Sequence, residues 1–535
     1  MKKVKKIFLS IFMTICMLSS FVACGKNTET ESSSTADYTD KATTSKVSQY
    51  WPDKKWRTSS PQEQGMSSEK LLEMINLIQK QQIDIHSIVI IRNGYKVLDA
   101  SFFPYKSDLK HSIFSCTKGV TSTLMGIATE EGDIKDINQK VVDFFPEYTI
   151  ENLDEAKKNL TLSHLLTMTT GLEWKENGSY DGTDSWVQTR WSGNYVQYIL
   201  NNPMSQDPGT SFYYNSGASH LLSAVLQKST GQNTYDYATR KLFEPLGIKE
   251  VFWESDPQGV NIGGTNLFMS AQDMARFGYL YLRNGCWNGK QLVSESWIKE
   301  ATTKHVDTPN AIAGRDGYGY QWWMNSFGGY SARGYGGQYI FVIPEEDLVV
   351  VFTSSLQGSD FFVPESLTKN YILTAVNSTQ SLEDDQVVSN QLQSKLEEIQ
   401  NPPKSSEIPP FPLLAKGVSG KKLELENGEV LELDFSENGN GPSVSFRHRM
   451  SNSIAIGLDD VYQISDAGNY WPLPDHNMVA TKGQWKDDKT FVINLLSLHE
   501  IDKIIYTISF EGSTVDVRMS SLQSGEIMHS KGQMK

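Results

Sequence analysis

The sequence predicts an α+β domain followed by a small all-β domain. Two hairpin patterns, at residues 87–99 and 338–352, frame a long stretch that is mostly helical. This order is typical of one antiparallel sheet that is built from both ends of a domain and faced by helices. Beyond about residue 413 the apolar residues alternate with period two, which is typical of the strands of a barrel or sandwich.

The first elements of the α+β domain carry clear local signals. Residues 67–80 have apolar side chains at helical spacing and predict an amphipathic helix. The apolar runs 87–92 and 95–99 flank Asn93-Gly94, a dipeptide that favours positive φ and a tight hairpin turn. These residues therefore predict the first antiparallel pair of strands.

The last elements of the domain return to strand patterns. The middle third predicts helices joined by loops rich in Gly, Pro and Trp. Strands are then expected at 338–342 and 348–352, around the acidic turn 344–347. A helix at 366–376 is expected to close the domain, which we place at residues 51–380.

A second boundary follows this domain. Residues 382–400 are polar and charged, and the segment from 401 to 412 is rich in proline, so residues 381–412 predict a linker. Residues 413–535 form the predicted all-β domain, whose first hairpin turns at Asn427-Gly428.

The N-terminus has the layout of an export signal. Four lysines precede the mostly apolar run 7–21, and Ala23 then leads to Cys24. This ending resembles a bacterial lipoprotein signal at residues 1–23, with Cys24 as the lipidated residue; simple secretion stays open because Phe21 stands where Leu is usual. Residues 24–50 are polar and predict a disordered tether. We therefore expect a membrane lipoprotein that faces outside the cytoplasm.

Charge and cysteine content limit the partners. A net charge of −14 argues against a nucleic-acid partner, because phosphate binding needs clustered cations. No His or Cys spacing predicts a metal site, and we expect no cofactor. Outside the signal region only Cys116 and Cys286 remain, and their pairing cannot be deduced from sequence. Cys116 is expected to be a buried thiol.

One Ser-x-x-Lys sequence stands out from the others in the chain by its context. Ser115-Cys116-Thr117-Lys118 follows an apolar pair and opens a helix of small and apolar residues. The i, i+3 spacing places both side chains on one helix face. The start of the helix offers free N–H groups to a developing oxyanion, and burial would lower the pKa of Lys118. Ser115 is therefore the candidate nucleophile and Lys118 its candidate base, although an isolated match of this kind is more often an N-cap Ser beside a Lys that reaches solvent.

With this motif the sequence resembles the serine β-lactamase and penicillin-binding-protein superfamily, over residues 56–378. The segment Pro208-Gly209-Thr210 to Gly217 is similar to the segment that carries the family's Tyr-x-Asn motif. Counting from Pro208, the resemblance implies that Tyr214 shares the proton relay and that Ser216 takes the usual Asn position. A register starting at Tyr213 matches the motif literally and stays open.

The third family motif resembles Ala332–Gln338. The resemblance implies that the amides of Ser115 and Tyr335 form the oxyanion hole, and that Gly334 lets backbone approach the substrate. Gln338, together with Ser216, Gly334 and Trp186, is a candidate for substrate contact. The chain contains no Lys-Thr-Gly, which helps relatives bind the β-lactam carboxylate.

These motifs imply a β-lactamase/transpeptidase-like domain that hydrolyses a small ester or amide through an acyl-enzyme on Ser115. A D-amino-acid peptide of the cell wall and a β-lactam stay open as substrates. The alternative is a penicillin-recognising sensor that is acylated without turnover. A hydrolase with a His-containing triad is disfavoured, because the chain has no Gly-x-Ser-x-Gly nucleophile elbow. The role of the all-β domain also stays open.

Overall fold

The structure, a computed structural model, describes residues 50–52, 55–176, 182–309, 315–383, 385–435, 441–470, 473–474, 476–521 and 525–535. The predicted signal at 1–23, the lipidation site Cys24 and the tether up to residue 49 lie outside the described residues. None of the described helices is long and apolar enough to cross a membrane.

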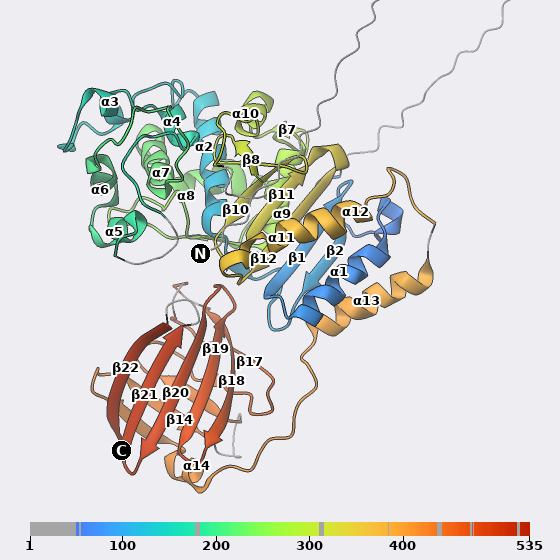
Figure 1. The fold of residues 1–535 in the computed structure, drawn as a ribbon, viewed down its shortest axis with the longest axis vertical. Coiled ribbons are helices and arrows are strands. Elements are labelled where there is room, and N and C mark those ends of the chain that lie inside the picture. Colours follow the sequence, from blue (N-terminus) through green and yellow to red (C-terminus); the bar gives the residue numbers. More distant parts are fainter. Residues whose placement is uncertain are drawn as a thin grey trace, which may run out of the picture. The chain divides into compact units, whose positions relative to one another are not determined.

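Within the described residues, seven antiparallel strands form the sheet of the first domain, in the order β2-β1-β12-β11-β10-β9-β8 (Figure 1). Strands from the two ends of the domain lie side by side: β1 pairs with β12, with Ile90 opposite Val350. This confirms the prediction of one sheet built from both ends. The strands are β1 (Ile85–Arg92), β2 (Tyr95–Ser101), β8 (Arg315–Tyr318), β9 (Trp323–Asn325), β10 (Tyr330–Gly334), β11 (Gln338–Ile343) and β12 (Leu348–Ser354).

The two early predictions hold in detail. Helix α1 spans Ser68–Gln81, with Ser67 as its N-cap. Asn93 and Gly94 both have positive φ, 50° and 78°, which is the backbone that a tight hairpin between twisted strands needs.

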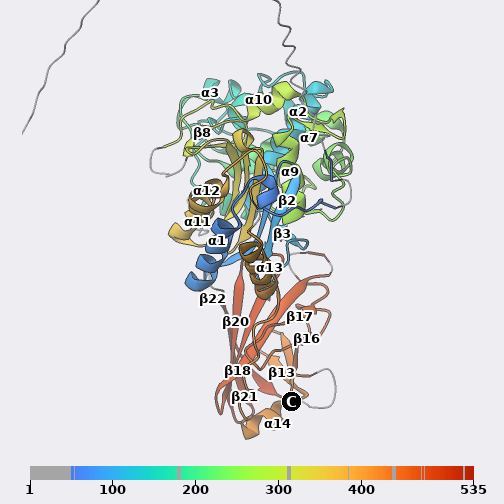
Figure 2. The same ribbon diagram turned by 90° about the vertical axis from the view of Figure 1, so that its right-hand side faces the viewer.

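Both faces of the sheet are covered by helices, so its strands are buried on both sides. Ile88 and Ile90 of β1 pack into one hydrophobic core with α1, and Val89 and Ile91 pack into the other, because successive side chains of a strand alternate between faces. Figure 2 shows the sheet between α1, α11 and α12 on one side and α2 and α9 on the other. These helices are α2 (Thr117–Glu130), α9 (Ala271–Leu282), α11 (Val363–Leu367) and α12 (Leu373–Ala375).

The middle of the chain is helical, as predicted, and forms a lobe beside α2 (Figure 1). Helix α7 is buried along most of its length and contacts α2, which brings the start of α7 close to the start of α2. The remaining elements here are β3 (Lys110–Ser112), α3 (Glu155–Lys158), α4 (Leu162–Leu166), α5 (Ser185–Trp191), α6 (Tyr195–Asn201), α7 (Ser216–Thr230), α8 (Thr234–Ala238), β4 (Phe252–Trp253), β5 (Leu267–Ser270), β6 (Cys286–Trp287), β7 (Lys290–Gln291) and α10 (Glu295–Ala301).

One prediction is wrong: residues 381–412 are not linker throughout. Helix α13 (Gln386–Gln400) begins at the N-cap Asp385 and buries Leu392 and Ile399 in the core formed with α1 and the sheet. The exposed face of α13 is so polar that the composition of the segment resembles a linker, whereas its few apolar residues lie at helical spacing. Only residues 401–412 connect the two domains without a helix or strand.

The C-terminal domain is a nearly closed barrel, which decides between the predicted barrel and sandwich. Its described strands follow the order β16-β15-β14-β13-β22-β21-β20-β19-β18-β17, and a bridge between Gly457 and Lys482 of β18 joins its two ends. The elements are α14 (Leu413–Val418), β13 (Lys421–Leu425), β14 (Val430–Asp434), β15 (Ser443–Phe446), β16 (Ile454–Ala455), β17 (Gln463–Asp466), β18 (Met478–Asp487), β19 (Thr490–Ser497), β20 (Lys503–Glu511), β21 (Thr514–Ser521) and β22 (Gly525–Met534).

Candidate active site

Ser115 lies in a short 3₁₀ turn, Phe114–Cys116, that runs directly into α2. The preceding residue, Phe114, has a φ of 45°, a left-handed backbone that bulky residues rarely adopt and that is often found at functional sites. Gly334 at the end of β10 passes so close to this turn that a Cβ atom there would lie 2.4 Å from the Ile113 carbonyl oxygen. The glycine predicted at this position therefore permits the close approach of β10 to the Ser115 turn.

Lys118 lies one turn further along α2 and is almost fully buried. Its Nζ is 2.9 Å from Ser115 Oγ, 2.8 Å from Ser216 Oγ and 2.7 Å from the carbonyl oxygen of Gly264. The structure thus brings together the two residues predicted from Ser-x-x-Lys and adds two further partners.

The hydrogens of this network can be assigned from chemistry. Ser216 Oγ lies 2.5 Å from Glu176 Oε1, and a carboxylate oxygen accepts only, so Ser216 donates its single hydroxyl hydrogen to Glu176. Ser216 must then accept from Lys118, and the carbonyl of Gly264 also accepts. Lys118 therefore donates two of its N–H groups to Ser216 and Gly264. The third tetrahedral position on Nζ, which holds a hydrogen or the lone pair, faces Ser115 Oγ.

Burial sets the protonation of Lys118. Removal from water lowers its pKa to about 8, while the negative charge of Glu176 opposes this and favours the ammonium form. An amine with this pKa is neutral in about a tenth of the molecules at pH 7 and in about half of them at pH 8. In the neutral form the nitrogen lone pair occupies the position that faces Ser115 Oγ.

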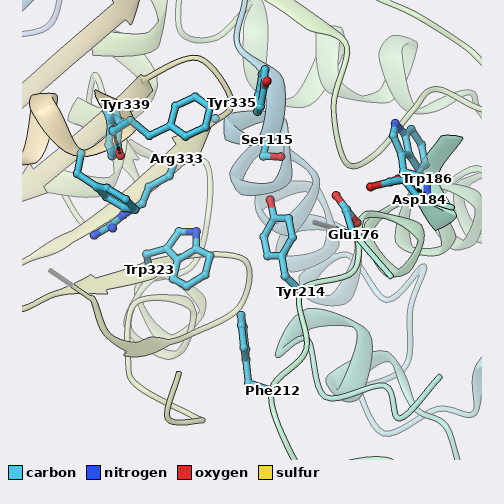
Figure 3. A pocket seen from close by; sticks show the side chains of 13 residues that line it. Ser115, Glu176, Asp184, Trp186, Phe212, Tyr214, Trp323, Arg333, Tyr335 and Tyr339 are labelled. Carbon is cyan, nitrogen blue, oxygen red and sulfur yellow. Dashed lines mark hydrogen bonds between the residues drawn. The ribbon is translucent and has the colours of Figure 1, made fainter. Parts of the chain in front are cut away.

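The two adjacent tyrosines take different positions. Tyr214 lines the same pocket as Ser115 and directs its hydroxyl toward Ser115 (Figure 3). Its ring lies over Lys118, with Nζ 4.7 Å from the ring centroid, and stacks on Trp323. Tyr213 is 46% exposed and is not among the residues that line this pocket. The geometry favours the register that starts at Tyr214.

Asn215 supports the same register. Its side chain accepts a hydrogen bond from the amide of Ala218 at 2.9 Å and so forms the N-cap of α7. Asn215 is therefore occupied with the helix end, and the next residue, Ser216, is the one that reaches Lys118.

The turn between β10 and β11 lies across the pocket from Tyr214. Gly336 and Gly337 both have positive φ, and their carbonyls accept from Ser354 Oγ. Gln338 is fully buried: its side-chain amide donates to the carbonyls of Tyr335 and Ser354. Gln338 therefore stabilises the turn and does not line the pocket, which corrects the expectation that it contacts substrate.

These groups surround a pocket of about 320 Å³ whose walls are mainly aromatic (Figure 3). Trp186, a candidate for substrate contact from the sequence, lies in the wall of this pocket. Arg333 also lines the pocket, but its guanidinium is paired with the buried carboxylate of Glu365 at 2.6 Å. The lining residues are Ser115, Glu176, Asp184, Trp186, Phe212, Tyr214, Trp323, Arg333, Gly334, Tyr335, Tyr339, Phe361 and Phe362.

Comparison with known proteins identifies this arrangement. The model of the Beta-lactamase family matches residues 73–369, more than half of the chain. The chain belongs to the Beta-lactamase family. Its fold is accordingly a β-lactamase/transpeptidase domain, to which the C-terminal barrel is added.

Similar proteins within and around this family are named as hydrolases. The 6-aminohexanoate-dimer hydrolase of Paenarthrobacter ureafaciens is 26% identical over 282 residues, which cover 49% of this chain and 69% of that protein. Esterase EstB of Burkholderia gladioli is 26% identical over 164 residues, or 29% of this chain and 41% of the esterase. A solved structure from Bacillus anthracis, provisionally named a 6-aminohexanoate-dimer hydrolase, has a TM-score of 0.50 at 21% identity and covers 63% of this chain and 91% of its own. The last similarity concerns the fold alone.

Two members of the site, Glu176 and Gly264, were not predicted from the sequence. The carboxylate of Glu176 accepts hydrogen bonds from the backbone amide and the hydroxyl of Ser216, and a third from the indole N–H of Trp174. Gly264 gives its carbonyl to Lys118, and a Cβ there would lie 2.9 Å from the Ser216 carbonyl oxygen. The Gly263-Gly264 pair was a visible signal for a close backbone approach, whereas Glu176 had no local signal.

Two histidines of the helical lobe have structural roles. His220 is buried and contacts Asp256 at 3.0 Å, and His164 takes part in the cap of α4. In the described part of the chain Cys116 and Cys286 are free thiols, and Cys116 is buried, as expected.

Proposed function

We propose that this protein is a serine hydrolase that acts through an acyl-enzyme on Ser115, with Lys118 as general base and Tyr214 in the proton relay. The observation that carries the proposal is the hydrogen-bond set of Lys118. Two of its positions are fixed by Ser216 and Gly264, and the third faces Ser115 Oγ at 2.9 Å. This is the geometry that a general base needs toward its nucleophile.

In the acylation step, Ser115 Oγ forms a bond to the carbonyl carbon of the substrate as its proton passes to the neutral amine of Lys118. The carbonyl π electrons move to oxygen, and the amides of Ser115 and Tyr335 would bind that oxyanion. When the tetrahedral intermediate collapses, the bond to the leaving oxygen or nitrogen breaks. The leaving group takes up the proton from Lys118 through the hydroxyl of Tyr214, a relay that the direction of this hydroxyl toward Ser115 supports.

In the deacylation step, water attacks the ester carbon of the acyl-enzyme. Its proton passes through the same groups to Ser115 Oγ as the acyl bond breaks. The product acid leaves and the starting state returns, so no other reactant is needed.

The substrate that we propose is a small ester or amide. The pocket of about 320 Å³ has aromatic walls, which favour an apolar acyl or leaving group. The names of the hydrolase from Paenarthrobacter ureafaciens and of Esterase EstB support the same chemical class. Cell-wall peptides and β-lactams pass through the same kind of acyl-enzyme and belong in the same test.

The test has two parts. A fluorophosphonate probe should label the wild type and not Ser115→Ala, and labelling that persists in Ser115→Ala would overturn the assignment. A parallel turnover screen with p-nitrophenyl esters, a short ω-amino-acid amide, a chromogenic cephalosporin and a D-Ala-D-Ala peptide then ranks the substrates. Intact-mass measurement with the best ester separates a hydrolase, whose adduct is transient, from a sensor, whose adduct persists.

For the cellular location we propose export and lipidation at Cys24. The support is the sequence of the signal region, with its basic start, apolar run and Ala23-Cys24 ending. Metabolic labelling with a fatty-acid analogue should mark the wild type and not Cys24→Ser. Labelling that is equal in both would favour simple secretion or another attachment.

A further inference from the structure

A loop of the barrel reaches the strand that leads to Ser115. The loop between β19 and β20, residues 498–502, packs along β3. The amide of Ser112 donates to the carbonyl of His499 at 2.8 Å, and His499 Nδ1 donates to the carbonyl of Lys110 at 2.6 Å. The other edge of β3 pairs with β5, so this loop holds the edge that β5 leaves open. Strand β3 ends at Ser112, three residues before Ser115.

The same loop contacts the turn that carries Tyr335. The side chain of Ile501 is buried against Gly336: a Cβ atom at Gly336 would lie 3.0 Å from both Cδ1 and Cγ2 of Ile501. The carbonyl of Ile501 accepts from Ser355 Oγ at 2.6 Å, which fixes the loop just beyond the end of β12. Ile501 therefore covers the outer side of the turn.

The inner side of this turn is held by the catalytic domain itself. Ser354 Oγ donates to the carbonyls of Gly336 and Gly337, and the amide of Leu356 donates to Gly336 at 2.9 Å. Two consecutive glycines with positive φ give the turn little intrinsic stiffness. Its outer side is closed by Ile501, so the contact with the barrel limits how far the turn can move away from Ser115.

The loop is itself anchored on both sides. Met478 of β18 donates its amide to His499 Nε2 at 3.0 Å, and Asp502 accepts from Ser521 of β21 at 2.5 Å. Lys503, which follows the loop, forms an ion pair with Asp84 of the catalytic domain at 2.6 Å. Because residues 498–502 are anchored at both ends, Ile501 has a fixed position from which it can restrain the turn at Gly336.

We propose that Ile501 of the barrel is a positioning residue for the oxyanion hole: by packing on Gly336 it holds the amide of Tyr335 in place opposite that of Ser115. The barrel would then belong to the catalytic machinery. This inference rests on the proposed function, in which the amide of Tyr335 stabilises the oxyanion. Because an oxyanion donor acts mainly in the transition state, its misplacement should lower kcat more than it raises KM.

The decisive variant is Ile501→Ala in the full-length chain, with p-nitrophenyl butyrate as substrate and phenylboronic acid as a probe that forms a tetrahedral adduct on Ser115. We expect kcat to fall about tenfold, part of the loss found when an oxyanion donor is removed altogether. The affinity for the boronic acid should fall in parallel, with KM within about twofold of the wild type. Ile501→Leu should restore most of kcat, because it keeps the contact.

Ile508→Ala is the matched control. Ile508 lies in β20 and is buried in the barrel core, so its truncation should destabilise the barrel at least as much without touching Gly336. An Ile501→Ala enzyme with wild-type kcat, or a loss of kcat that Ile508→Ala reproduces, would overturn the inference.

A second variant and a labelling control make the test of the Ile501 contact decisive. If Ile501→Ala does not fold, Ser355→Ala removes the hydrogen bond to the Ile501 carbonyl, and its kcat must fall for the inference to survive. Fluorophosphonate labelling of the wild type at Ser115 separates the two proposals. If the wild type is not labelled, the proposed function fails. If it is labelled and the Ile501 and Ser355 variants behave as wild type, only the positioning role fails.

Discussion

Ser216 donates its only hydroxyl hydrogen to Glu176 across 2.5 Å. This contact has a consequence at the nucleophile, because it leaves Ser216 able only to accept from Lys118. The carboxylate of Glu176, in the wall of the pocket, thereby orients the Lys118 amine so that its third tetrahedral position points at Ser115 Oγ. In the proposed mechanism Glu176 is therefore a positioning residue, and its charge also raises the pKa of the Lys118 amine.

Replacing Glu176 by Gln should separate these two effects. The negative charge of Glu176 raises the pKa of Lys118, so its loss should move the acidic limb of the kcat/KM profile to lower pH. The plateau rate should fall about tenfold, because Ser216 is held by a weaker neutral partner. Glu173→Gln is the control, since Glu173 is exposed and lies only three residues away. A profile that keeps its position in Glu176→Gln would contradict the electrostatic role.

The wild type should itself show a basic optimum. Burial lowers the pKa of Lys118 to about 8, and in the proposed mechanism the neutral amine is the active form. The rate of acylation should therefore rise about tenfold per pH unit below pH 8 and level off above it. Stopped-flow measurement of acyl-enzyme formation from pH 5.5 to 9.5 checks this. A flat profile across pH 8 would mean that another group accepts the proton.

The two tyrosines offer a matched pair. Tyr214→Phe should lower kcat by about two orders of magnitude with an amide or a poor leaving group, because general acid assistance is lost. With an activated nitrophenyl ester the loss should be smaller, since that leaving group needs no proton. Tyr213→Phe should behave as wild type, because the phenol of Tyr213 is exposed. Equal losses in both variants would argue for a general effect on the loop before α7.

The site was predictable where its geometry is local. Ser115 and Lys118 are three residues apart on one helix, so their contact follows from helical spacing. The distance to the Pro208 turn favoured Tyr214 over Tyr213, and the lining of the pocket favours the same register. Glu176 reaches the site from a loop that packs beside α7, and nothing in its immediate sequence indicates the contact with Ser216.

The fold shows the same division. The hairpin at Asn93-Gly94 and the alternating strands of the barrel depend on local turn chemistry and period-two patterning. Helix α13 was missed because its burial rests on few residues, chiefly Leu392 and Ile399, in an otherwise polar segment. The contact between Ile501 and Gly336 joins two domains, and a sequence pattern carries no information about such a pairing.

Three neutral histidines lie where the barrel loop meets β3. His111 Nδ1 donates to the carbonyl of Ser112 at 2.8 Å, and its Nε2 accepts from His86 Nδ1 at 2.9 Å. His499 donates to Lys110 and accepts from Met478. The rings of His111 and His499 are therefore satisfied without a second proton. Burial lowers the pKa of His111 to about 4, and also lowers the pKa values of His86 and His499.

The protein should therefore lose stability in mild acid. In the unfolded chain these histidines bind a proton near pH 6.5, whereas His111 in the folded chain stays neutral down to about pH 4. Between these values the unfolded state binds more protons, so the free energy of unfolding falls as pH falls, by about 3 kcal/mol for His111 alone. Urea unfolding at pH 7, 6, 5 and 4 measures this slope. His111→Gln should be less stable at pH 7 and show a flatter slope. His448→Asn, at an exposed position of the barrel, should keep the wild-type slope. If the wild-type free energy of unfolding stays constant from pH 7 to 4, the histidines are not the acid-sensitive groups of this junction.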